Sequence, residues 1–208
     1  MEAKTLSIST FIEDLSSSAP APGGGGASAL IAAVGTSLAH MVGSLTVGKK
    51  KYADVEADII ALNEKMSALT DRLLFLMDED ERVFIPLSKA YGLPKDTPEQ
   101  QAEKTRVMEA ALKDAAEVPI ALMRVCAEAI DMLFDYAKKG TAIAISDVGV
   151  GAAALRAGLM GASLNVFINT KSMKDKEYAK KLNAEANSLI EEYAKKAEDV
   201  FFNVKNRF

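Results

Sequence analysis

The chain has 208 residues, of which 26% are charged and 49% hydrophobic, which is ordinary for a soluble globular protein. Its net charge of −4 offers no basic surface for DNA or RNA, so no nucleic-acid partner is expected. One cysteine, Cys126, excludes an internal disulfide, and one histidine, His40, argues against a histidine-based zinc site or a Ser-His-Asp triad.

The N-terminal part of the chain leads into a glycine-rich turn. Ser9 is expected to cap a short helix that ends at Leu15. Two prolines and four glycines follow between Pro20 and Gly26, and segment 27–47 behind them contains no charged residue. This segment predicts a helix buried on most sides. The glycine turn at its start exposes N–H groups that suit an anion or a polar ligand edge.

Segment 27–47 is also long enough to span a bilayer. However, it contains several Ser and Thr residues, His40 and mostly small apolar residues, and no second span is evident elsewhere. We therefore expect a buried helix and no membrane partner. The start of the chain lacks the charged and apolar regions of a secretion signal, and a single cysteine fits a reducing compartment, so a cytoplasmic protein is expected.

Long helices dominate the remainder. Apolar residues at heptad spacing predict a helix over 54–90 with a kink at Pro86. After a loop at 91–98, a second helix is predicted to reach Lys138 or Lys139, with a bend at Pro119 and a glycine stop at Gly140.

The C-terminal third predicts a helix rich in small residues that starts at Ser146-Asp147 and breaks or bends at Gly161. A capping box at 172–175 predicts a last helix to about Val204. No strand alternation is convincing. The pattern predicts an all-α fold, a single-domain bundle of about six helices over residues 1–208, and its apolar stripes favour a homodimer.

Asp80 is the first candidate for chemistry. It falls on the apolar stripe of its helix, between Leu76 and Val83. A carboxylate at such a position must meet a cation, a donor or a ligand, because burying it alone is costly. Asp78 lies on a neighbouring face and is a weaker candidate, whereas the other two acids of the cluster are interpreted as solvated.

Other polar residues are weaker candidates. The lysines Lys49, Lys50 and Lys51 follow the uncharged helix and either pair with its C-terminal dipole or clamp an anion. Asp147 is a first-turn acid by its position, and Lys95 is a loop charge. His40 and Cys126 are interpreted as core residues. The glycines match neither a dinucleotide fingerprint nor a phosphate-binding loop.

Eight segments, taken together and in order, resemble the formiminotetrahydrofolate cyclodeaminase / methenyltetrahydrofolate cyclohydrolase family, and most closely its free-standing cyclohydrolase members. They span about residues 8–175, with one departure at Gly26, where the family often has Ser or Ala. The segments are 11–15, 19–25, 45–52, 78–80 with Phe84, 93–97, 118–119, 146–150 and 164–169.

The resemblance implies an all-α dimer that acts on a tetrahydrofolate derivative as substrate, without a metal or other cofactor. It implies a folate site with Asp80, Asp78, Lys50 and Lys95 as catalytic candidates. The implied substrate-binding residues are Gly23, Gly24, Gly25, Lys49, Asp147 and Asn165. Asp80 is expected to act as base or cation stabiliser when water adds to 5,10-methenyltetrahydrofolate, which yields 10-formyltetrahydrofolate. Lys50 or Lys95 is expected to donate a proton or to anchor the glutamate tail.

Two other functions stay open at this point. In the cyclodeaminase reaction, N10 of 5-formiminotetrahydrofolate attacks the formimino carbon and ammonia leaves, so one site serves either reaction. The chain carries no fused formiminotransferase domain, which favours the cyclohydrolase slightly. A helical interaction module with lost activity is disfavoured, because Asp80, Lys49, Lys50 and Asp147 are all present.

Overall fold

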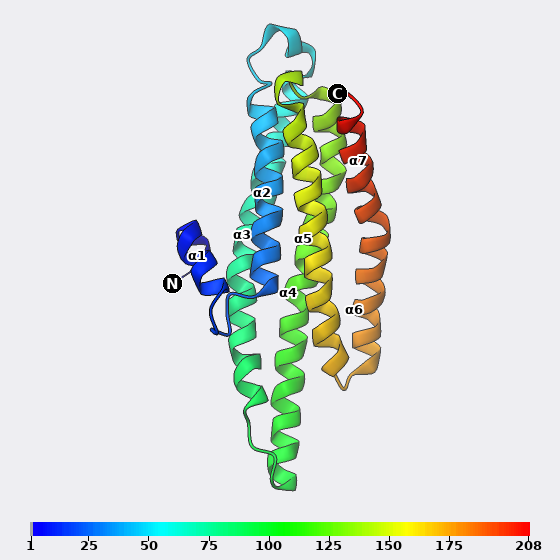
Figure 1. Cartoon of the computed structure of the whole chain (residues 1–208). Helices are drawn as coiled ribbons and strands as arrows, with labels where there is room; N and C mark the ends of the chain where they lie inside the picture. The colour runs from blue at the N-terminus through cyan, green and yellow to red at the C-terminus, as the bar shows by residue number, and fades with distance from the viewer. Residues whose placement is uncertain (1) are drawn as a thin grey trace.

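Four long helices, α2 to α5, lie alongside one another, and α6 and α7 cover one side of this bundle (Figure 1). The computed structural model describes residues 2–208. The α-helices are α1 Ile8–Leu15, α2 Gly24–Ser44, α3 Glu56–Tyr91, α4 Pro98–Lys139, α5 Ile145–Ser172, α6 Lys176–Leu189 and α7 Lys195–Lys205. Short 3-10 turns are Ala3–Thr5, Lys50–Val55 and Ala142–Ala144, and a π-helical stretch, Ile190–Ala194, joins α6 to α7.

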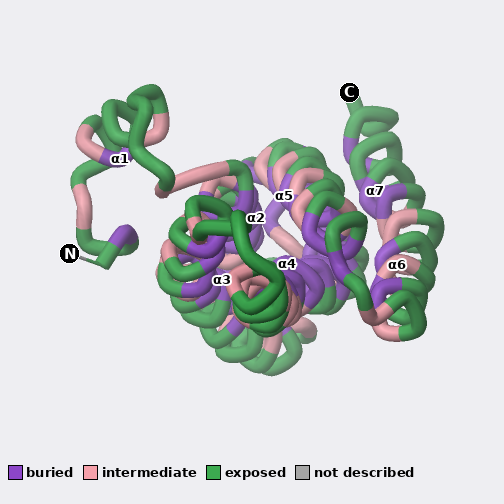
Figure 2. Tube along the Cα trace, turned by 90° about the horizontal axis from the view of Figure 1, so that it is seen from below, coloured by how far each residue is buried: buried purple, intermediate pink, exposed green. Residues whose placement is uncertain are grey.

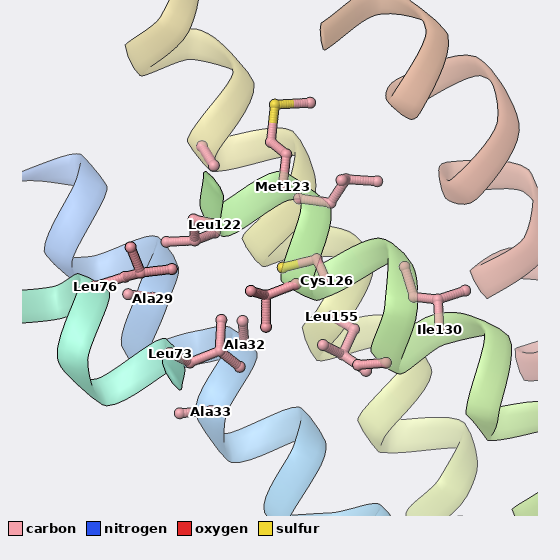
Figure 3. Close-up of a cluster of buried hydrophobic side chains, with 14 of the residues drawn as sticks. Ala29, Ala32, Ala33, Leu73, Leu76, Leu122, Met123, Cys126, Ile130 and Leu155 are labelled. Carbon is pink, nitrogen blue, oxygen red and sulfur yellow. The ribbon is translucent and has the colours of Figure 1, made fainter. Parts of the chain in front are cut away.

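The core lies where the small side chains of α2 meet the large side chains of α3, α4 and α5. Ala29, Ala32 and Ala33 of α2 point into a cluster with Leu73 of α3 and Leu155 of α5 (Figure 3). Because alanine occupies little volume, α2 can lie close to three neighbours at once, and about half of its residues are buried. The interpretation of Cys126 as a core residue is confirmed, because its side chain lies fully inside this core. Burial raises the pKa of its thiol to about 12.

Glycines bring α2 and α5 into backbone contact. A Cβ at Gly35 would lie 2.9 Å from the carbonyl oxygen of Gly151, and one at Gly158 would lie 2.8 Å from Cβ of Ala32. Such distances leave no room for a larger side chain. The small residues predicted for the two helices therefore serve their mutual packing.

The predicted all-α architecture is confirmed within residues 2–208, where α6, the π stretch and α7 run as one continuous helix and give six helices in total. Several predicted boundaries were wrong. Helix α2 begins at Gly24, so three of the four glycines belong to the helix rather than to a preceding turn. Ser7, not Ser9, caps α1, because its hydroxyl accepts the N–H of Thr10.

The predictions for α5 and α6 also need correction. Helix α5 continues through Gly161. This position packs directly against Ser28 of α2 and leaves no room for a side chain, which explains a glycine inside the helix. Helix α5 starts behind a 3-10 turn, without Ser146 as its cap. Helix α6 is capped by Asp175, whose side chain accepts the N–H of Tyr178, and not by Ser172.

Two helical segments, Gly24–Ser44 and Ala142–Ser172, are long and apolar enough to cross a membrane, so the expectation of a single such segment was wrong. About half of each lies buried inside the fold, 56% and 50% respectively. Buried core helices pass the same test of length and hydropathy, so this finding by itself assigns no membrane location.

Candidate active site

A cavity of about 150 Å³ lies where the N-terminus of α2 meets α3, α4 and α5. Its polar lining comes from Asp80 and two amides, Asn165 and Asn169. Two helices, α3 and α5, therefore direct polar groups toward the start of α2. The apolar and glycine lining residues are Pro20, Ala21, Gly23, Gly24, Gly25, Val83, Phe84, Ala115 and Ile168.

Asp80 lies directly against the first turn of α2. Its Oδ2 accepts a hydrogen bond of 2.9 Å from the backbone N–H of Gly26. A Cβ at Gly25 would overlap the Asp80 carboxylate, so only glycine permits this approach. The N–H groups of Gly24 and Gly25 begin the helix and have no acceptor within it. An anionic side chain at this helix end is also favoured by the helix dipole.

The environment of Asp80 makes it a weak acid. Burial raises the pKa of its carboxyl group above the ordinary value, because the charged form loses water. The hydrogen bond from Gly26 lowers this pKa in part, and the neighbouring charge of Glu81 raises it. The prediction that a carboxylate interrupts the apolar stripe of this helix is thus matched by a largely buried carboxylate facing a cavity.

Asn165 and Asn169 stand one turn apart on α5. The Asn165 side-chain NH₂ donates to the Gly161 carbonyl at 3.1 Å, and that of Asn169 donates to the Ala115 carbonyl at 2.8 Å. These bonds hold both amides in place and leave their carbonyl oxygens as acceptors. Asn165 also lies next to Gly24, since a Cβ added at Gly24 would lie 3.6 Å from Nδ2 of Asn165.

Comparison with known proteins identifies the family. The sequence profile described as Formiminotransferase-cyclodeaminase matches residues 7–188. This chain belongs to that family.

Named relatives fall into two kinds. A methenyltetrahydrofolate cyclohydrolase from Methylorubrum extorquens is 42% identical over 96% of both chains. The formimidoyltransferase-cyclodeaminase of Rattus norvegicus is 33% identical over 89% of this chain, which corresponds to 34% of that larger protein. A crystal structure of a formiminotetrahydrofolate cyclodeaminase from Thermotoga maritima superposes with a TM-score of 0.82 at 29% identity, covering 99% of this chain and 96% of that one. The resemblance seen in the sequence is confirmed.

The family resemblance implied ten site residues, and the structure brings five of them together. Gly23, Gly24, Gly25, Asp80 and Asn165 line the cavity.

Asp78 points elsewhere. One of its carboxylate oxygens accepts the backbone N–H of Lys4 at 3.1 Å, and the other lies 3.2 Å from the Lys4 ammonium. Two positions along the helix from Asp80, it faces a different neighbour, since successive residues of a helix are about 100° apart. In this chain Asp78 ties the N-terminal segment to α3.

Lys49, Lys50 and Asp147 lie at the opposite end of the bundle. Lys49 contacts Thr141 through a hydrogen bond of 3.4 Å from its ammonium group, just before Asp147 in the first turn of α5. The 21 residues of α2 separate this end from Gly24, which corresponds to roughly 30 Å. Within one chain these three residues do not meet Asp80.

Lys95 lines a second groove, of about 310 Å³, below the cavity. Lys104 and Lys174 share this groove with it. The groove continues the cavity along two helices: on α4, Leu112 lies one turn from Ala115, and on α5, Ser172 lies one turn from Ile168. An anionic extension of a molecule bound in the cavity would therefore meet lysine side chains.

Sequence reasoning from pattern alone missed the apolar wall and Asn169. Phe84 and Ile168 line the cavity, yet each looks like an ordinary apolar residue of a helix. The spacing of Asn165 and Asn169 was the available signal, because two amides at i and i+4 share one face of a helix. The interpretation of His40 as a core residue was wrong: it is half-buried and borders an open groove between α2 and α3, with its Nδ1 3.3 Å from Ser44 Oγ.

Proposed function

We propose that this chain hydrolyses 5,10-methenyltetrahydrofolate to 10-formyltetrahydrofolate. The observation that carries the proposal is a largely buried carboxylate, Asp80, held against the N-terminus of α2 in a cavity with two fixed amides. The substrate is a cation at its one-carbon bridge, and a carboxylate with little competing solvent attracts such a charge strongly. Identity of 42% to a cyclohydrolase over nearly the whole chain supports the same choice.

The first step adds water to the bridging carbon. The Asp80 carboxylate accepts a proton from the water as its oxygen bonds to the carbon, and the product is a neutral carbinolamine. Burial raises the pKa of Asp80, which makes it a stronger base than an exposed aspartate. Activity is therefore expected to fall as pH drops through this raised pKa, because the protonated carboxyl group cannot accept the proton.

The second step breaks the bond between the carbon and N5. The leaving nitrogen needs a proton, and protonated Asp80 carries one. The carbinol O–H loses its proton as the carbonyl forms, which leaves the formyl group on N10. Overall, one water is consumed and one proton is released. Asn165 and Asn169 offer carbonyl oxygens that suit the donor edge of a pterin.

The tail carboxylates of the substrate are assigned to the groove of Lys95, Lys104 and Lys174. Helix α3 runs from Asp80 to Tyr91 before the loop with Lys95, a length of roughly 15 Å. This length separates Lys95 from the reacting carbon and supports an anchoring role rather than proton transfer. Lys104 is already engaged, since its ammonium donates to the carbonyls of Tyr91 and Leu93 at 2.7 Å.

Replacement of Asp80 tests the reaction. Asp80→Asn retains the size of the side chain and an acceptor for Gly26 but removes the base. We expect the rate of methenyltetrahydrofolate loss, followed by its absorbance, to fall by about 10²- to 10⁴-fold. An unchanged rate in this variant, or no turnover above the uncatalysed rate by the original chain, would contradict the proposal.

Lys95→Gln tests the tail site. It should raise KM roughly 2- to 5-fold with little change in kcat, as expected for the loss of one partly exposed charge pair. The difference should shrink at high salt. Lys180→Gln, on the exposed face of α6, is the matched control and should leave KM unchanged. A drop in kcat alone would speak against anchoring.

The cyclodeaminase reaction is the second candidate, supported by the likeness to the Thermotoga maritima enzyme. Appearance of methenyltetrahydrofolate absorbance and ammonia from 5-formiminotetrahydrofolate would establish it. A chain that binds no folate and catalyses neither reaction would instead be a helical interaction module. We further propose that the protein works in the cytoplasm as a homodimer, with residues 1–208 as one domain and no metal or cofactor besides the folate substrate.

A further inference from the structure

Pro119 lies buried in the interior of α4, and Val118-Pro119 is one of the segments that resemble the family. The helix continues through this proline, from Pro98 to Lys139. Proline has no backbone N–H, so it removes one hydrogen bond from a helix interior and disfavours the helix more than any other residue does. A residue with this cost needs a compensating role at its position.

The missing N–H leaves one carbonyl group of α4 without its usual donor. In an α-helix each N–H donates to the carbonyl four residues earlier, so the carbonyl that loses its donor at Pro119 is that of Ala115. The proline ring also crowds this carbonyl, which opens the helix locally. Ala115 is buried and borders the Asp80 cavity. Because a buried carbonyl without a donor is unfavourable, it needs a partner from outside α4.

Asn169 of α5 supplies this partner. Its side-chain NH₂ donates to the Ala115 carbonyl at 2.8 Å, across 54 positions of the sequence. Helices α4 and α5 lie side by side, with buried residues where they meet (Figure 2). Asn169 is itself only 9% exposed. The hydrogen bond that proline removes from α4 is therefore replaced by one that joins α4 to the wall of the cavity on α5.

Asn165, one turn earlier on α5, is held in a different way. Its NH₂ donates to the Gly161 carbonyl of its own helix at 3.1 Å. That carbonyl has a helical donor as well, the backbone N–H of Asn165 itself. Of the two amides in the cavity, Asn169 is thus the one whose orientation depends on α4.

The orientation of the Asn169 amide decides what it offers to a ligand. A backbone carbonyl can only accept, so the amide turns its nitrogen toward Ala115 and keeps its oxygen free. Within residues 2–208, no protein group donates to this oxygen. If the amide faced a backbone N–H instead, it would present its NH₂ to the cavity. A ligand group that lies beside Asn169 must therefore be a hydrogen-bond donor.

We infer that Pro119 is a positioning residue: it frees the Ala115 carbonyl to hold the Asn169 amide, so that Asn169 presents an acceptor to the donor edge of the bound pterin. The identity of this ligand rests on the proposed function, whereas the hydrogen bond does not. The donor edge of a pterin carries its exocyclic amino group and the neighbouring ring N–H. An acceptor that is fixed before binding holds this edge more tightly than a mobile one, because less conformational freedom is lost.

Pro119→Ala tests the inference because it returns the N–H to α4. The new N–H competes with Asn169 for the Ala115 carbonyl, so the amide loses its fixed orientation. We expect KM for methenyltetrahydrofolate to rise about 3- to 10-fold with little change in kcat, as for the loss of one hydrogen bond that binds substrate. Alanine favours a helix, so the variant should fold. A KM equal to that of the original chain would overturn the inference.

A control and a double variant separate positioning from a purely structural role. Pro86→Ala is the matched control, because the carbonyl that Pro86 frees in α3, that of Arg82, has no side-chain donor among residues 2–208, and its KM should not change. Asn169→Ala should raise KM about 10-fold, since it removes the acceptor itself. Adding Pro119→Ala should then raise KM no further, because the proline acts through this amide. Independent effects would multiply to about 30- to 100-fold, and that result would overturn the inference.

Hydrogen exchange tests the same contact without a substrate. In NMR spectra of the isotope-labelled original chain, the side-chain NH₂ of Asn169 should exchange with solvent at least about tenfold more slowly than that of Asn187, which is exposed on α6. Pro119→Ala should remove this protection, and Pro86→Ala should not. Rapid exchange in the original chain would overturn the inference. Slow exchange that Pro119→Ala removes would support the positioning of Asn169 even if the chain turned over no methenyltetrahydrofolate, so this result and a failure of the proposed function are distinguishable.

Discussion

A single side chain, Asp80, illustrates how position sets the environment of an ordinary residue. Its identity as an interruption of an apolar stripe is visible in the sequence, but its partner is not. Gly25 and Gly26 lie more than 50 positions earlier in the chain, and the structure brings their backbone against the carboxylate. The missing Cβ of Gly25 is what permits this contact. The site therefore depends as much on an absent side chain as on a present one.

Asp80 is also expected to cost stability. Because burial raises its pKa in the folded chain, the folded state holds a proton that the unfolded state has already released. Stability from this group is thus full below the ordinary pKa and is lost as pH rises through the raised one. Asp80→Asn should unfold like the original chain near pH 3.5 and be about 0.5–2 kcal/mol more stable at pH 7. Urea unfolding across this range measures it, and a variant that is less stable at pH 7 would contradict it.

Among the secondary-structure elements, α2 and α5 were predicted correctly as helices, but the sequence pattern did not predict how much of each is buried. Their lack of charge predicted burial, yet each buries only part of its surface and leaves a regular apolar row outside. Gly161 was expected to interrupt α5, but a glycine that packs against a neighbouring helix is compatible with a straight continuation. Local patterns do not distinguish a glycine that ends a helix from one that admits a neighbour.

The contact between α2 and α5 is tested by Gly158→Ala. Its new methyl group would lie 2.8 Å from Cβ of Ala32 and 2.9 Å from the Ser28 carbonyl, so the helices must move apart. We expect a loss of about 1–3 kcal/mol in the free energy of unfolding. Gly92→Ala is the control, because its Cβ would meet only the Lys89 carbonyl at 3.5 Å. Equal stability of both variants in urea unfolding would argue against tight packing here.

For the molecule as a whole, the shape of the bundle separates the groups that the family resemblance brings together. One end holds the carboxylate and the glycines, the other holds Lys49, Lys50 and Asp147, and α2 spans the distance between them. The long α3–α4 hairpin carries the basic groove with Lys95 beyond the cavity. Within one chain, these two groups of residues therefore cannot act on the same atom of a small substrate.

If two copies unfold together, stability must depend on concentration. The thermal midpoint of the original chain should rise by a few degrees over a hundredfold increase in protein concentration, because dissociation accompanies unfolding. Calorimetry at several concentrations measures this, and a constant midpoint for the original chain would argue against a dimer.

The sequence by itself determined the helical class, the approximate bounds of the long helices and the family, and it singled out Asp80 as a candidate. These are properties of local periodicity and of residues recognisable one at a time. Only the tertiary structure decided which candidates share a cavity, because that depends on the length and direction of α2 and on how closely glycines let helices approach. It turned Asp78 toward Lys4, left Lys49 at the far end, and added Phe84 and Asn169 to the wall. Contacts between distant segments are set by packing, and packing has no period along the chain.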